Sequence, residues 1–288
     1  MIDTSFLHQL DRFNLVISRK VNSNYIGERQ SSATGRGLIY KDHAPYTIGD
    51  DFRSIDWKVY ARLDKLFVKR FEEERNLQVH ILVDYSGSMN FGTTFKKAEF
   101  AAMIGLGYAY IALKSNEKFV LSTFAEGLER YRAKRGRTQL AAMVEYLNKK
   151  VPEGSTDIVQ ALGSYRKLLH HRSLVIIVSD FLYNLNDLRN VLYQFKDHEI
   201  RLIQVLDKVE RKLTLEGDFR LKDLESNSVL RTYISPYLKK RYQEQLVEHN
   251  KELRKIAMEL GGRFFTVSTD MTIFDAMFLT LVDRPLRI

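Results

Sequence analysis

The central part of the chain reads Leu77-Gln-Val-His-Ile-Leu-Val-Asp84, and Tyr85-Ser-Gly-Ser88 follows without a break. The first of these runs is mostly aliphatic and β-branched, and it ends on an acid. Its apolar character is continuous rather than alternating, which is typical of a strand that is buried on both faces. This stretch therefore predicts a central strand of a parallel sheet, with Asp84 at its carboxyl end.

Outward from this strand, strand and helix patterns alternate as far as residue 281, which indicates a parallel sheet with helices on its faces. The sequence predicts further strands over residues 118–124, 173–180, 200–206 and 264–267. It predicts helices over residues 95–113, 138–149, 156–170, 186–195, 238–260 and 273–281. The expected fold class is α/β, a doubly wound, mostly parallel, Rossmann-like sheet with a small β-rich subdomain.

The first 77 residues have a different pattern, so we expect two domains. Residues 1–77 are expected to form an N-terminal helix and a small β-rich subdomain, in which the lone Trp57 anchors the core. Residues 78–285 are expected to form the α/β domain, with a β-hairpin insertion at about 211–233. For the segment from Gly49 to Arg62 we favour a structural scaffold over catalysis, because no nucleophile stands beside a base there.

The composition excludes several kinds of protein. The chain has 288 residues, no cysteine and a formal net charge of +9. Without cysteine there is no disulfide framework, thiolate metal site or cysteine nucleophile, and any metal must be held by oxygen or imidazole. The longest uncharged apolar stretch, residues 100–113, is shorter than the ~18 to 20 residues that span a bilayer. Since the N-terminus also lacks a signal-peptide pattern, we expect a cytoplasmic protein without a membrane span.

The positive charge is spread along the chain and does not point to one partner. The densest run, Arg130 to Arg137, carries five basic residues in eight, which could contact phosphate or an acidic partner. A solvated loop between a strand and a helix is the favoured interpretation. Nucleic-acid binding is not expected, because Tyr131 is the sole aromatic residue within the run.

Oxygen-bearing side chains follow two of the predicted strands. Asp84 and Asp180 end their strands, and ligands bind at the carboxyl ends of such strands in open α/β sheets. Ser86 and Ser88 follow Asp84 at alternate positions, and Thr156 stands in a second loop expected above the same edge. Carboxylate and hydroxyl oxygens form a hard-ligand set that suits Mg²⁺ or Mn²⁺.

The sequence therefore predicts a divalent-cation site, with Mg²⁺ first and Mn²⁺ or Ca²⁺ as alternatives. Asp84, Ser86, Ser88 and Thr156 are expected to bind the cation directly, and Asp180 directly or through water. The Asp-x-Ser-x-Ser motif by itself also fits a helix cap followed by small turn residues. The order of strand, motif, threonine loop and second acid-ended strand favours the metal site. We expect no catalytic residues and no organic cofactor.

These residues resemble the metal-ion-dependent adhesion site (MIDAS) of von Willebrand factor A domains, whose fold is a doubly wound sheet. The resemblance to one prokaryotic family, the domain of unknown function number fifty-eight, covers nearly the whole chain. It rests on Gly35-x-Gly37, the segment from Tyr46 to Lys58, Ala61-Arg62, Glu72 to Glu74, Ser179-Asp180-Phe181 and Asp223-Leu-Glu225. One departure is Ala44, which stands where the family is expected to carry arginine.

The resemblance implies a non-enzymatic module for protein–protein interaction. It implies an intracellular partner, a MoxR-type AAA+ ATPase, in chaperone-like assembly or activation of other proteins. An acidic residue of a partner protein would complete the metal shell. The alternative is a phosphohydrolase that uses Mg²⁺ or Mn²⁺ at the same site. Against the alternative, Ser86 stands where aspartyl-phosphate enzymes usually carry a second acid, two residues after the first.

Overall fold

The computed structural model describes residues 2–3, 5–21, 34–35, 39–72, 78–131, 138–155, 157–225 and 228–281. By their contacts, the residues form two compact units. The larger unit contains Met1–Ile17 and Leu77–Ile288, and the smaller unit contains Ser18–Asn76. The first part of the N-terminal helix thus groups with the α/β residues, whereas the sequence analysis places this helix with the β-rich subdomain.

The larger unit is built on a six-stranded sheet in the order β11-β8-β7-β4-β5-β6. The stretch that begins at residue 78 forms a central strand of this sheet and pairs in parallel with the neighbour on either side. Only the edge strand β6 is antiparallel, so the predicted doubly wound, mostly parallel fold class is confirmed. The strands are β4 (Gln78–Asp84), β5 (Lys118–Phe124), β6 (Leu128–Arg130), β7 (Ser173–Ser179), β8 (Glu199–Leu206) and β11 (Arg263–Ser268).

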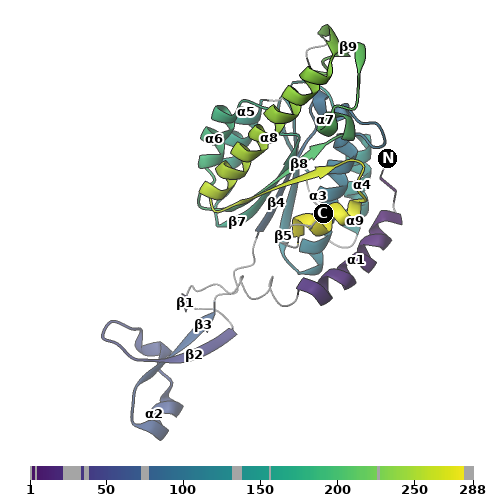
Figure 1. Ribbon diagram of the computed structural model, residues 1–288. Helices are drawn as coiled ribbons and strands as arrows, with labels where there is room; N and C mark the ends of the chain where they lie inside the picture. Colours follow the sequence, from purple (N-terminus) through teal and green to yellow (C-terminus); the bar gives the residue numbers. More distant parts are fainter. Residues whose placement is uncertain are drawn as a thin grey trace. The chain divides into compact units, whose positions relative to one another are not determined.

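Helices cover both faces of this sheet (Figure 1). On one face lie α5 (Ile158–Arg166), α6 (Leu185–Tyr193) and α8 (Pro236–Glu259), which share a hydrophobic core with β4, β7 and β8. On the other face lie α3 (Lys97–Lys114), α4 (Thr138–Lys149) and α9 (Ile273–Leu281). No helix in the described ranges combines the length and the apolar character that a membrane crossing requires.

Helix α3 lies directly against the central strands, and a glycine permits this close approach. A Cβ atom at Gly105 would lie only 2.9 Å from Cγ2 of Val83 in β4. Most of the side chains of α3 are therefore buried, including that of Lys97 in its first turn. This placement brings a lysine close to the carboxyl ends of the strands, where the candidate site lies.

The N-terminal helix α1 (Ser5–Val21) packs on the larger unit through its first turns. The rings of Phe6 and Phe13 lie 6.0 and 5.1 Å from the ring of Phe274 in α9. The backbone N–H of Ile2 donates to Asn148 Oδ1 at 2.8 Å, and Asn148 Nδ2 donates to the Ile2 carbonyl at the same distance. These contacts attach the start of the chain to α9 and α4.

A short helix and a hairpin connect β8 to α8. Helix α7 (Lys208–Lys212) begins just after β8, and β9 (Gly217–Lys222) pairs with β10 (Val229–Ile234) in an antiparallel hairpin. This hairpin spans Gly217–Ile234, whereas the sequence analysis expects an insertion at about 211–233. Leu224, which follows β9, lies close to the loop after β4, because its carbonyl oxygen is 2.5 Å from where a Cβ atom of Gly87 would be.

The smaller unit contains a three-stranded sheet in the order β1-β3-β2, formed by β1 (Thr34–Gly35), β3 (Phe67–Glu72) and β2 (Ile39–Pro45). The 3₁₀ helix η1 (Phe52–Ser54) and helix α2 (Trp57–Leu63) connect β2 to β3. A small core is formed by Ala44, Ile55 and Val68, so the residue that departs from the family pattern is a core residue here. Asp56 caps α2 through the N–H of Lys58 and accepts a 2.9 Å hydrogen bond from His43.

The prediction that Trp57 anchors this core is wrong. Trp57 is the first residue of α2 and is 60% exposed. Its ring packs edge-on against Tyr60 of the same helix, with ring centroids 6.1 Å apart. The core consists of Ala44, Ile55 and Val68 with Tyr46 packed against them, and the indole lies outside it.

Candidate functional site

Asp84 ends β4 and is fully buried. Its Oδ1 accepts a hydrogen bond from the backbone N–H of Ser86 at 2.9 Å. Its Oδ2 accepts hydrogen bonds from the hydroxyls of Ser179, at 2.6 Å, and Tyr183. Burial, together with the nearby charge of Asp180, raises the pKa of Asp84 to about 6. The carboxylate is thus held rigidly, and its charge is incompletely compensated.

The two serines of the loop connect this strand to the second acid. The hydroxyl oxygens of Ser86 and Ser88 lie 3.1 Å apart, and the Ser88 hydroxyl donates to Asp180 Oδ2 at 2.9 Å. Because β4 and β7 are neighbours in the sheet, the loop after β4 and the acid after β7 meet at the same edge. The structure therefore brings Asp84, Ser86, Ser88 and Asp180 together, as the sequence predicts.

Asp180 is held in place by its neighbours in the sheet and on α8. Gln204 of β8 donates from Nε2 to the carbonyl oxygen of Asp180 at 3.0 Å. The next residue, Phe181, is fully buried with φ of +53°, a conformation that bulky residues rarely adopt. His249 of α8 donates from Nε2 to the Phe181 carbonyl at 2.7 Å. Hydrogen bonds to the backbone carbonyls of Asp180 and Phe181 therefore fix the turn after β7.

Thr156, the fifth predicted ligand, lies outside the described residues. The loop just before it contacts the serine loop, because the N–H of Gly87 donates to the carbonyl of Gly154 at 2.8 Å. The N–H of Glu153 donates to the carbonyl of Tyr85 at 3.1 Å. Asp157, on the other side of Thr156, caps α5 through the N–H of Gln160. Backbone hydrogen bonds thus connect residues 153 and 154 to the loop that carries both serines.

A lysine that sequence reasoning missed lies at the same place. Lys97 is 1% exposed, and its Nζ donates to Asp180 Oδ2 at 2.9 Å and to Glu210 Oε1 at 2.8 Å. Burial acts to lower the pKa of Lys97, but the charges of Asp180 and Glu210 outweigh it and raise the pKa above its ordinary value. Lys97 is therefore a buried cation that compensates part of the negative charge of the site.

Helix α7 presents Glu210 to this lysine. Asp207 caps the helix, and Glu210 Oε2 in turn accepts the backbone N–H of Asp207 at 2.9 Å, which completes a capping box. Asp207 itself is buried at the end of β8, where it accepts hydrogen bonds from Thr93 and Thr269. This third strand-end acid fixes the loop at Thr93 and the start of α7.

Two further residues of the site, Ser179 and Tyr183, differ in how clearly the sequence marks them. Ser179 directly precedes Asp180, so its place at the strand end could have marked it. Tyr183 lies in the following turn, and nothing in the sequence pattern singles it out. Burial and the charge of Asp84 raise the pKa of Tyr183 well above its ordinary value, so the phenol remains a donor.

The arrangement fits a hard divalent cation in the chemistry of its donors. Two hydroxyl oxygens lie next to one carboxylate, with a second carboxylate buried behind them, and such oxygens are the preferred ligands of Mg²⁺. Among the described residues, no three His, Asp or Glu side chains form a metal-binding group, so a cation here would depend on the serines. The three hydrogen bonds to Asp84 leave one lone pair of Oδ1 for a cation or a bridging water.

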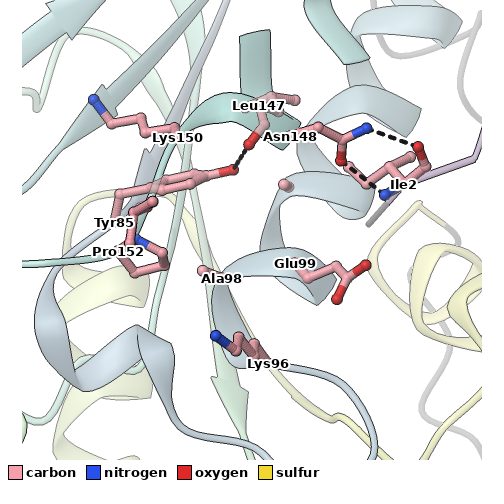
Figure 2. A pocket seen from close by; sticks show the side chains of 11 residues that line it. Ile2, Tyr85, Lys96, Ala98, Glu99, Leu147, Asn148, Lys150 and Pro152 are labelled. Atoms are coloured by element: carbon pink, nitrogen blue, oxygen red, sulfur yellow. Dashed lines mark hydrogen bonds between the residues drawn. The ribbon is translucent and has the colours of Figure 1, made fainter. Parts of the chain in front are cut away.

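A pocket of about 290 Å³ lies beside the candidate site and is distinct from it. Figure 2 shows Tyr85 on one wall, with its hydroxyl donating to the Leu147 carbonyl at 3.3 Å, and Lys96 and Lys150 among the lining residues. None of the predicted metal ligands lines the pocket. Of the basic run from Arg130 to Arg137, residues 132–137 lie outside the described part of the chain.

The six-stranded, mostly parallel sheet with helices on both faces is a doubly wound α/β fold, the fold class that von Willebrand factor A domains share. The chain belongs to the family described as Protein of unknown function DUF58, whose model matches residues 42–252. An uncharacterized protein of Mycobacterium tuberculosis is 25% identical over 273 residues, which cover 93% of this chain and 86% of that protein. An uncharacterized protein of Mycobacterium avium is 26% identical over 114 residues, covering 40% of this chain and 68% of that protein.

Solved structures with a similar fold include BatB from Bacteroides thetaiotaomicron, with a TM-score of 0.43 and 13% identity over 70% of this chain and 95% of that chain. The VWA domain of SpRpn10 has a TM-score of 0.42 and 10% identity, covering 69% of this chain and 93% of that chain. Manganese-loaded TRAP protein of Plasmodium vivax has a TM-score of 0.35 and 18% identity, covering 45% and 57%. These likenesses concern the fold alone.

Proposed function

We propose that this protein is a non-enzymatic, metal-dependent module for protein–protein interaction of the MIDAS type, which acts in the cytoplasm. The observation that carries the proposal is the hydrogen-bonded row from Ser86 through Ser88 to Asp180, with Asp84 buried directly behind it. Mg²⁺ is the expected cation, with Mn²⁺ or Ca²⁺ as alternatives. An acidic side chain of the partner protein completes the metal shell.

The proposed partner is a MoxR-type AAA+ ATPase, and the proposed role is chaperone-like assembly or activation of other proteins. Membership of the DUF58 family, together with the matching motifs of the smaller unit, supports this partner. The carboxyl-end position of the serine loop also supports it, because such an edge can receive a side chain from another protein. The metal then acts as a bridge between the two chains.

The test is affinity capture of the ATPase from the same genome by the purified full chain. Mg²⁺ is expected to support capture, and EDTA or the substitution Asp84→Ala is expected to abolish it. Asp187→Ala removes an exposed aspartate in the first turn of α6 and serves as the matched control, with unchanged capture expected. Equal recovery in all lanes would overturn the proposal. Turnover of a generic phosphoester with Mg²⁺ or Mn²⁺ would instead support the phosphohydrolase.

A further inference from the structure

Lys97 is an unusual neighbour for a cation site. Its side chain is almost completely buried at the start of α3, and its ammonium group lies between two carboxylates, at 2.9 Å from Asp180 and 2.8 Å from Glu210. A buried ammonium is costly unless it is paired and hydrogen-bonded. Lys97 thus forms ion pairs with both carboxylates, and one of them belongs to the candidate metal site.

The lysine uses the same oxygen atom that faces the serines. Asp180 Oδ2 accepts a hydrogen bond from Lys97 Nζ and another from the hydroxyl of Ser88, so both of its lone pairs are engaged. A divalent cation bound directly to this oxygen beside Ser88 would have to displace one of these hydrogen bonds, and it would also be repelled by the ammonium a few ångströms away. Metal and Lys97 therefore compete for Asp180.

Glu210 is the second partner of the lysine, and its carboxylate is held in place by another hydrogen bond. Its Oε1 contacts Lys97, while its Oε2 is held by the backbone N–H of Asp207 in the capping box of α7. If Lys97 releases Asp180, Glu210 still pairs with the ammonium. The cost of binding a cation at Asp180 is then lower than it would be without Glu210.

We infer that Lys97 is the resident counter-cation of Asp180, and that it sets the metal affinity of the site by releasing Asp180 and keeping its ion pair with Glu210 when a divalent cation binds. This inference rests on the proposed metal site. It assigns Lys97 as a residue that limits cation affinity, and it assigns Glu210 as the residue that holds the displaced ammonium. Neither residue needs to contact the cation.

The experiment is calorimetric titration of Mg²⁺ and of Mn²⁺ into the purified full chain, without any partner protein. Lys97→Met removes the competitor at nearly constant volume, and it is expected to tighten binding by about tenfold or more, since a nearby like charge is lost. Glu210→Gln removes the alternative partner and is expected to weaken binding severalfold. Lys167→Met removes an exposed lysine at the end of α5, and unchanged affinity is expected.

A double variant separates the exchange from a simple loss of negative charge. If Glu210 acts through Lys97, Glu210→Gln has little effect on affinity in a chain that already carries Lys97→Met. If Glu210→Gln weakens binding as strongly in that background, the exchange is refuted. Should Lys97→Met fail to fold by circular dichroism, Lys97→Gln replaces it in the single and the double variant, and unchanged or tighter binding by Glu210→Gln refutes the inference in any case.

The outcomes also distinguish this inference from the proposed function. Binding to the wild type with no tighter binding to Lys97→Met overturns the role of Lys97 and leaves the metal site intact. Absence of binding to both proteins at millimolar Mg²⁺ and Mn²⁺ overturns the metal site and the inference with it. Tighter binding to Lys97→Met, together with a Glu210 effect that depends on Lys97, supports both.

Discussion

Lys97 and Asp180 form a buried ion pair at the carboxyl edge of the sheet, with Nζ 2.9 Å from Oδ2. The pair joins the first turn of α3 to the end of β7 and lies next to two serine hydroxyls and a second buried acid. The fold therefore compensates one of the two carboxylates of the candidate site internally. The hydrogen bonds that the described residues donate to Asp84 come from neutral groups, the N–H of Ser86 and the hydroxyls of Ser179 and Tyr183, and this difference leads to the first prediction.

Asp84→Asn is expected to stabilise the metal-free protein near neutral pH. The pKa of Asp84 is raised in the fold to about 6, so its contribution to stability is present at low pH and is lost as the pH rises through that value. Urea denaturation at about pH 7.5 and at about pH 4 measures the difference. The variant should be more stable at the higher pH and similar to wild type at the lower one. A variant that is less stable than wild type at both pH values would contradict the claim that the buried charge of Asp84 destabilises the fold.

Acid is expected to destabilise the protein through His80 of β4. Burial lowers the pKa of His80 to about 4, so the folded chain excludes a proton that the unfolded chain binds below about pH 6.5. This stabilising contribution is present above pH 6.5 and is lost as the pH falls toward 4, by up to about 3 kcal/mol.

The His80 contribution is measured by comparing wild type with His80→Gln over this pH range, because the comparison cancels the opposite contribution of Asp84. Wild type should lose stability relative to the variant as the pH falls. Parallel pH profiles for the two proteins would contradict the prediction.

Gly87→Ala is expected to distort the serine loop. A Cβ atom there would lie 2.5 Å from the Leu224 carbonyl oxygen and 3.1 Å from that of Gly154, and both are backbone atoms that cannot rotate away. A loss of about 1 to 3 kcal/mol in stability is expected, as for other overpacked positions. Gly163→Ala in α5 is the matched control, since no atom lies within 4 Å of its Cβ position. The control should be neutral or stabilising, and equal effects at the two glycines would refute the contact.

Trp57→Ala is expected to cost little stability, although Trp57 is the single tryptophan of the chain. The side chain is 60% exposed, and substitutions of exposed residues typically change the free energy of unfolding by no more than about 0.5 kcal/mol. Val68→Ala in the core of the smaller unit should cost more, because it leaves a cavity. Circular dichroism during thermal unfolding provides the readout. A larger loss for Trp57→Ala than for Val68→Ala would show that the indole is a core residue after all.

The sequence predicts the part of the site that follows from strand ends. Continuous apolar runs that end in Asp84 and Asp180 predict buried parallel strands, and neighbouring strands place their last residues at the same edge. The order of these residues along the chain is sufficient to predict that they meet, because the sheet itself brings the two loops together.

The residues that sequence reasoning missed depend on long-range packing. Lys97 meets Asp180 across 83 positions and Glu210 across 113, and only the close approach of α3 to the sheet creates these contacts. The prediction for Trp57 is wrong because it assumes that the lone tryptophan is a core residue. None of the seven residues of α2 is buried. Thr156 remains a prediction, since it lies outside the described residues.

The most direct test of the central claim is a crystal of the full chain soaked in Mn²⁺, with diffraction measured at a wavelength where manganese scatters anomalously. The account predicts a single strong anomalous peak within bonding distance of the Ser86 and Ser88 hydroxyl oxygens, with Asp180 bound directly or through one water, and no peak in Asp84→Ala crystals. A peak elsewhere, or none in wild-type crystals, would contradict the claim that this loop is a metal site.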